Sequence, residues 1–146
     1  MEQQERQSLG RIIAGLHWQV RVYFDNALAP FGLSSGTLPL LRSLLRRDGL
    51  NQQELSERLH VDKATITRMI GKRMESGYVR REKDPADKRA YQLFATQKAH
   101  AIAPEIKQVL RDWTAILSEG FTDEEKKQAF ALLTRMRDNA LRYREK

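Results

Sequence analysis

The sequence predicts a mainly α-helical protein with one short β-hairpin, and three observations support this prediction. Apolar residues recur at intervals of three and four over most of the 146-residue chain, as in amphipathic helices. Two short β-prone stretches, residues 78–82 and 91–95, flank a charged turn that contains Pro85. No internal repeat or low-complexity segment interrupts this order. We therefore expect helices at both ends of the chain and a central unit that includes the hairpin.

The first expected helix covers residues 9–29, because its apolar residues form one stripe at helical spacing. Pro30 and Gly32 are expected to end this helix. A second, leucine-rich helix follows, and Asp48-Gly49 marks the turn after it. The stripe of the first helix consists of Leu9, Ile12, Ile13, Leu16, Val20, Tyr23, Phe24 and Ala27.

Two shorter helices are expected in the centre of the chain. Asn51 is predicted to cap a helix over residues 52–59, with Glu54 as its capping-box partner. Asp62 is predicted to cap the next helix, which runs to about residue 76 and ends before Gly77. Two helices joined by a tight turn make a helix-turn-helix. The buried side of the second helix is predicted to carry Ile66, Met69, Ile70 and Met74.

The C-terminal part returns to helical spacing over residues 97–118, and Pro104 inside this run predicts a kink or a late start. Thr122 is expected to cap the last helix, with Glu125 completing its capping box. The terminal stripes form no second obvious domain, and two copies of the chain can bury them together. We therefore predict dimerisation helices in residues 1–33 and 97–146, around a helix-turn-helix unit with its hairpin in residues 34–96.

Composition narrows the classes of function. The formal net charge of +7 favours a polyanionic partner such as DNA, RNA or an anionic membrane. The absence of cysteine excludes disulfides, thiolate zinc sites and thiol redox sensing. No apolar run is long enough to span a bilayer and the N-terminus has no signal-peptide pattern, so we expect a cytoplasmic protein with no membrane partner. Three scattered histidines and the lack of any catalytic set predict no metal, no other cofactor and no enzymatic activity.

The helix-turn-helix and the hairpin tip together carry the residues that favour DNA. An α-helix fits the major groove of B-DNA, where Arg or Lys can donate to guanine and Thr can meet phosphates or thymine methyls. An Arg at the tip can enter an A·T-rich minor groove, and the Asp87 carboxylate is expected to orient the Arg89 guanidinium. The alternative interpretation is a solvated helix face and an exposed ion pair. The predicted DNA-binding residues are Gln52, Gln53, Lys63, Thr65, Thr67, Arg68, Lys72, Arg81, Lys83, Asp87, Lys88 and Arg89.

The run DKATITRMI over residues 62–70, followed by GYVRREKDPADKRAYQLFAT over residues 77–96, resembles the multiple antibiotic resistance regulator (MarR) family. The helix order is similar over essentially the whole chain, and DPADKR is the most specific piece. The resemblance implies a winged helix-turn-helix homodimer, with the helix over residues 62–76 in the major groove and Arg89 in the minor groove. Two departures stand out. Arg73 occupies a place where the family usually has Leu, so Met74 supplies the apolar residue and the helix end is expected to rotate or strain. Residues 97–99 replace the usual turn ending in Gly.

The resemblance also implies a ligand, because small aromatic or anionic molecules bind members of that family where the dimerisation helices meet the DNA-binding part. The expected function is a sequence-specific regulator of transcription that binds double-stranded DNA, a repressor released by such an effector. Two rival functions stay open: a winged helix that binds other proteins, and an RNA-binding protein. The residues expected to line the effector pocket are His17, Trp18, Arg21, Phe24 and Trp113, with Arg21 as the charge partner; the alternative is that the aromatic residues are core and Arg21 is solvated.

Overall fold

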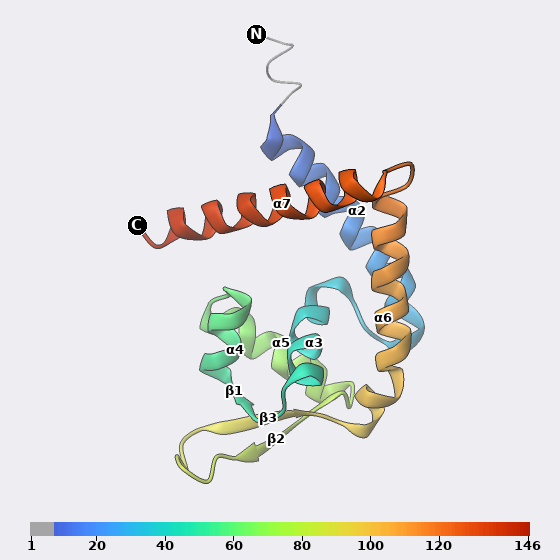
Figure 1. Cartoon of the computed structure of the whole chain (residues 1–146). Coiled ribbons are helices and arrows are strands. Elements are labelled where there is room, and N and C mark those ends of the chain that lie inside the picture. The colour runs from blue at the N-terminus through green and yellow to red at the C-terminus, as the bar shows by residue number, and fades with distance from the viewer. Residues whose placement is uncertain (1–7) are drawn as a thin grey trace. The chain divides into compact units, whose positions relative to one another are not determined.

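A computed structural model describes residues 8–146, which fall into two compact units (Figure 1). The first unit ends at Val109 and the second covers Leu110–Lys146, so that the long helix α6 contributes to both. The first unit also holds a three-stranded antiparallel sheet. The elements are α2 (Leu9–Leu28), η1 (Ala29–Phe31), η2 (Ser35–Thr37), α3 (Leu38–Arg46), β1 (Leu50–Asn51), α4 (Gln52–Leu59), α5 (Lys63–Glu75), β2 (Val79–Lys83), β3 (Tyr91–Ala95), α6 (Gln97–Leu117) and α7 (Asp123–Arg144).

The structure confirms the predicted mainly helical fold with a small hairpin wing. Strand β3 lies in the middle of the sheet, between β1 and β2. The two residues of β1 were not predicted, because so short a strand has no periodicity to detect. It forms because Gly49, at φ 77°, turns the chain and donates its N–H to the carbonyl of Leu93 at 2.9 Å. Leu50 then lies opposite Leu93 in the register.

The core of the first unit lies between the helices and one face of the sheet. Leu40, Leu41 and Leu44 lie on one face of α3 and are completely buried. Each buried leucine or isoleucine contributes about 1.5–3 kcal/mol relative to exposure. This core holds α4 and α5 against the sheet, and its members include Leu40, Leu41, Leu44, Leu50, Leu55, Ile66, Val79 and Leu93.

Side-chain caps fix where the two helices of the helix-turn-helix begin. Asn51 accepts the N–H of Glu54 at 2.8 Å, while the Glu54 carboxylate accepts the N–H of Asn51 at 3.0 Å, which confirms the predicted capping box. Asp62 accepts the N–H of Thr65 at 2.7 Å, and this bond lowers the pKa of the Asp62 carboxyl below its usual value. Between the helices His60 adopts a left-handed conformation, φ 54°, that ends α4. The turn between the helices is thus set by local hydrogen bonds.

The end of α5 differs from the prediction. Met74 is only half-buried, whereas Arg73 is 5 % exposed and faces the core with Ile66 and Ile70. The helix has not rotated. Arg73 comes three residues after Ile70 and seven after Ile66, and residues at these spacings share one face of an α-helix. The guanidinium therefore lies in the interior, and its Nε and Nη1 have no hydrogen-bond partner within residues 8–146. Burial lowers the pKa of this guanidinium.

A kink or a late start was expected at Pro104. Helix α6 begins at Gln97 and passes through Pro104, so the late start is wrong. Thr96 holds this beginning: its hydroxyl oxygen accepts the N–H of Ala99 at 3.3 Å and its hydroxyl donates to the carbonyl of Gly77 at 2.6 Å. Lys98 adds a bond to the carbonyl of Ser76 at 2.7 Å. The departure from the family pattern at residues 97–99 thus leaves a well-anchored helix start.

In the second unit, Thr122 caps α7 as predicted. Its hydroxyl oxygen accepts the N–H of Glu125 at 3.1 Å. The predicted capping box is not formed, because the Glu125 carboxylate accepts the Thr122 hydroxyl at 3.1 Å and not the Thr122 main-chain N–H. Large apolar side chains of this unit remain exposed in the single chain, among them Phe130, Leu132 and Leu133. No helix of residues 8–146 has the length and hydropathy needed to cross a membrane.

Candidate nucleic-acid interface

The face of α5 that points away from the core is polar and cationic. Lys63, Thr67, Arg68 and Lys72 are exposed on it, and Thr65 is half-buried. Helical spacing places Thr65, Arg68 and Lys72 on the side opposite the buried Ile70, whereas Lys63, seven residues before Ile70, lies on the flank beside it. The structure thus spreads these five predicted residues over the solvent-facing side of α5 and its two flanks, where side chains can reach a groove of DNA.

A hydrogen bond ties this face to the start of α4. The Gln52 side-chain amide donates to the Thr67 hydroxyl oxygen at 2.7 Å, and that hydroxyl donates to the carbonyl of Lys63 at 2.7 Å. The Thr67 hydroxyl is thus engaged within the protein, and its methyl group is the part available for an apolar contact such as a thymine methyl. Gln53, one residue on, donates to the Glu57 carboxylate at 3.2 Å and is exposed.

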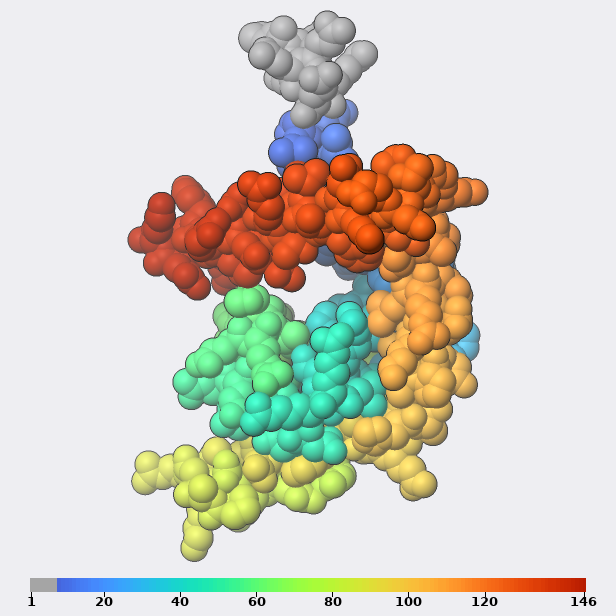
Figure 2. All heavy atoms as spheres, viewed as in Figure 1, coloured from blue at the N-terminus to red at the C-terminus, as the bar shows by residue number. Residues whose placement is uncertain are grey.

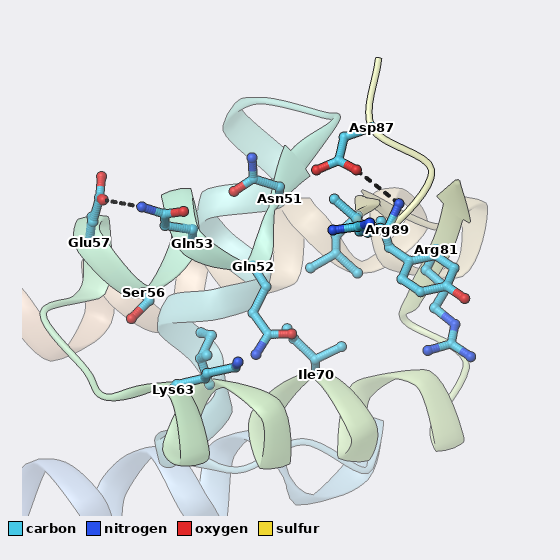
Figure 3. A pocket seen from close by; sticks show the side chains of 14 residues that line it. Asn51, Gln52, Gln53, Ser56, Glu57, Lys63, Ile70, Arg81, Asp87 and Arg89 are labelled. Carbon is cyan, nitrogen blue, oxygen red and sulfur yellow. Dashed lines mark hydrogen bonds between the residues drawn. The ribbon is translucent and has the colours of Figure 1, made fainter. Parts of the chain in front are cut away.

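A pocket of about 620 Å³ lies between α4, α5 and the hairpin (Figure 3). Its floor is apolar, formed by Ile66, Ile70 and Leu93. Polar side chains from three separate segments surround this floor. We call it the wing pocket, and the predicted DNA-binding residues that line it are Gln52, Gln53, Lys63, Arg81, Asp87 and Arg89.

The period of two in a β-strand explains why hairpin side chains reach the wing pocket. Arg81 pairs with Leu93 and Lys83 with Tyr91 in the register, so these four residues share one face of the sheet. Near Leu93 this face covers the core; toward the hairpin tip it continues past the core. Sequence reasoning missed Tyr91, although its spacing of two from Leu93 was the available signal. Its ring lies 4.5 Å from the Arg81 guanidinium, which holds that cation in place by a cation–π contact.

The hairpin tip is shaped by its aspartates. Asp84 accepts the N–H of Ala86 at 2.8 Å, and Asp87 accepts the N–H of Arg89 at 2.9 Å. The predicted contact of Asp87 with the Arg89 guanidinium is therefore wrong: the carboxylate binds the main chain and forms no ion pair with Arg89. A short Asp side chain in a turn readily reaches the N–H two residues on. Asp87 thus fixes the loop, while the Arg89 side chain remains exposed.

Lys83 and Lys88 are exposed at the hairpin and do not line the wing pocket. The hairpin tip stands out from the helices of the same unit (Figure 2). On the opposite face of the hairpin strands, the Arg80 guanidinium lies 4.5 Å from the Phe94 ring centroid and pairs with the Glu82 carboxylate. The wing therefore carries free cations near its tip and engaged ones near its base.

The predicted effector residues do not share one pocket in the first unit. His17 and Trp18 are exposed on α2, Trp18 by 61 %, whereas Phe24 is core and packs edge-on against Tyr23 with ring centroids 5.5 Å apart. Arg21 lines a separate hollow beside α5. The fifth residue, Trp113, belongs to the second unit and is half-buried. Within residues 8–146 no three His, Cys, Asp or Glu side chains are grouped to hold a metal ion.

Known proteins share the sequence of this helix-turn-helix and wing. The sequence profile of the MarR family matches residues 33–91, which include the helix-turn-helix and most of the wing. An HTH-type transcriptional regulator, BilQ of Clostridioides difficile (strain CD3), is 30% identical over 84% of this chain and 82% of its own length.

Solved structures of MarR regulators have the same fold as this chain. A MarR transcriptional regulator from Methanosarcina mazei Go1 superposes with a TM-score of 0.86 at 35% identity, over 92% of this chain and 97% of that one. A mutant of MarR from E. coli, solved in complex with operator DNA, superposes with a TM-score of 0.81 at 26% identity, over 90% and 95% of the two chains. The protein is therefore a member of the MarR family, a DNA-binding regulator of transcription and not an enzyme.

Proposed function

We propose that this protein is a homodimeric repressor that binds a specific sequence of double-stranded DNA and releases it when a small effector binds. The observation that carries this proposal is the wing pocket, where Lys63 of α5 lies together with the wing cations Arg81 and Arg89. In this arrangement α5 reads the major groove, and Arg89 reaches the adjacent minor groove, whose negative potential attracts it. Repression follows because a bound dimer blocks access of the polymerase. We place its activity in the cytoplasm, where bacterial-type operators lie.

The homodimer is supported by apolar residues that a single chain leaves exposed. Leu9, Ile12, Ile13 and Leu16 lie on one stripe of α2, and Leu9 is 58 % exposed. Contiguous exposed apolar patches mark interaction surfaces, and a symmetric partner offers an equivalent patch. Two copies also present two α5 helices to successive half-sites about one helical turn apart.

Substituting Leu16→Glu is expected to break the dimer, because a carboxylate would have to be buried unpaired in the interface. Sedimentation analysis should give twice the 17.0 kDa chain mass for the wild type and a single-chain mass for the variant. Ala14→Glu, on the opposite side of α2, is the matched control and should remain dimeric. A dimeric Leu16→Glu protein would refute this assignment of the interface.

Control by an effector rests on a shift between two arrangements of the dimer. A ligand that binds better to a dimer with wrongly spaced α5 helices lowers DNA affinity by its differential affinity for the two forms. Arg21 remains the proposed charge partner of such a ligand, with the exposed His17 and Trp18, one turn earlier on α2, as its proposed neighbours. Titration of small aromatic carboxylates into the DNA complex tests this part: none releasing the duplex would count against it.

The proposed function is tested by competition between nucleic acids. A labelled duplex, recovered by selection from random sequence, is bound by the wild-type protein and challenged with unlabelled duplex or with single-stranded RNA. We expect only the selected duplex to displace the label efficiently, because the α5 face suits the major groove of B-DNA and single-stranded RNA offers no such groove. Displacement by single-stranded RNA at comparable concentrations would favour the RNA-binding alternative.

A further inference from the structure

A second hollow, of about 330 Å³, lies on the other flank of α5 from the wing pocket. Three segments of the first unit surround it: α2, the η2 turn and α5. Its α5 residues, Thr65, Arg68, Met69 and Lys72, lie on the helix side away from Lys63 and Ile70, which line the wing pocket. We call it the α2–α5 pocket.

The charges around the α2–α5 pocket are unbalanced. Three cations line it, Arg21 from α2 and Arg68 and Lys72 from α5, against one carboxylate, Asp25. Asp25 accepts the N–H of Ser35 at 2.8 Å, which lowers its pKa and keeps it charged. None of the three cations forms an ion pair within the part of the chain that the structure describes. The pocket therefore has a surplus of positive charge that an anion can neutralise.

The position of the pocket indicates which anion reaches it. Arg68 and Lys72 also belong to the exposed α5 face proposed to enter the major groove. The phosphates of a duplex border that groove on both sides, so a helix seated in it has a phosphate backbone along each flank. One flank of α5 faces the wing, and the α2–α5 pocket receives the other. The turn beside it is open, because Gly36 is exposed and no heavy atom beyond its own chain neighbours lies within 4 Å of the place where a Cβ would stand.

We propose that the α2–α5 pocket is a phosphate-binding site that takes a backbone phosphate of the operator, and that Arg21 is a DNA-contacting residue outside the helix-turn-helix. This inference rests on the proposed binding of double-stranded DNA. It extends the DNA contact to α2, the helix that also carries the proposed dimer stripe. A free phosphate ion has the same chemistry, so the test has one arm for each source.

The first arm measures how the affinity for duplex DNA depends on salt. Arg21→Ala is expected to reduce the slope of log K against log[salt] by about 2, since each phosphate contact contributes about 0.9 and both copies of the dimer lose one, and to weaken selected and unrelated duplexes alike. Asp25→Asn is expected to tighten binding, because Asn still accepts the Ser35 N–H while the negative charge is removed. Arg11→Ala removes an exposed cation of the same helix outside the pocket and should leave the slope unchanged.

The second arm needs no DNA. Inorganic phosphate, added at constant ionic strength, is expected to raise the melting temperature of the wild type and of Arg11→Ala but not of Arg21→Ala. If phosphate raises the melting temperature in this pattern while all variants have the same slope of log K against log[salt], the site takes a free anion and not the DNA backbone. If Arg21→Ala matches Arg11→Ala in both arms, the pocket binds no phosphate and the inference fails. Failure of the wild type to bind any duplex would instead refute the proposed function, and the phosphate arm would still test the site.

Discussion

The affinity of the dimer for its operator duplex is expected to fall by about 10³-fold or more between 50 and 200 mM salt. Each phosphate neutralised by a Lys or Arg adds about 0.9 to the slope of log K against log[salt]. A fourfold rise in salt gives a 10³-fold loss when the slope is about −5, which takes roughly six phosphate contacts, or three from each copy. The exposed cations Lys72, Lys83 and Lys88 on α5 and the wing can supply that number in each copy.

Fluorescence anisotropy at four or five salt concentrations measures this slope. Lys127→Ala, which removes an exposed cation of α7 outside the proposed interface, is the control and should leave the slope unchanged. An affinity that stays flat across this salt range would mean that the cations of α5 and the wing do not face the DNA backbone.

Substituting Arg73→Leu is expected to stabilise the protein by about 1–4 kcal/mol per chain. The Arg73 guanidinium is buried, and two of its nitrogen atoms have no hydrogen-bond partner within residues 8–146. A buried charge without a partner loses its hydration without compensation, and replacing buried ionic groups by apolar ones of similar volume is often stabilising by this amount. The resemblance places Leu at the same position, so a leucine side chain suits that part of the core.

Urea unfolding at one fixed protein concentration measures the difference, because the stability of a dimer depends on concentration. Arg73→Lys retains a buried cation and should bring no such gain. A loss of stability in Arg73→Leu would show that the guanidinium has an anionic partner outside the described chain, for example in the second copy.

The main lines of the fold follow from local sequence signals. Asn51 with Glu54 and Asp62 before α5 are caps that act within four residues, so their hydrogen bonds are readable from the sequence alone. Strand β1 escaped prediction because its pairing with β3 is a contact over about forty residues and has no local pattern. Met74, four residues after Ile70, and Arg73, seven after Ile66, both fit helical spacing, so spacing alone could not show that Arg73 is the one buried and Met74 only half-buried.

The sequence shows which residues belong to the candidate site better than it shows which groups those residues contact. The polar face of α5 follows directly from helical spacing, and its residues are where the sequence placed them. The partner of Asp87 was not predictable from charge: a nearby main-chain N–H in the turn competes with the Arg89 guanidinium and is the group that the carboxylate binds. The position of Arg21 beside Arg68 and Lys72 depends on the packing of α2 against the η2 turn, which no pattern within one helix reveals.

If α5 and the wing tip together hold one duplex, a double substitution that removes one arginine from each should weaken binding strongly. Arg68→Ala combined with Arg89→Ala should weaken binding to the selected duplex by at least about 10²-fold at moderate salt, since a bidentate contact of Arg68 in the major groove contributes about 1–3 kcal/mol in each copy and the minor-groove contact of Arg89 adds to it. Arg11→Ala combined with Arg135→Ala removes the same charge from exposed positions outside both elements and should bind like the wild type. Undiminished duplex binding by the Arg68 and Arg89 variant would contradict the account and favour a winged helix that binds other proteins.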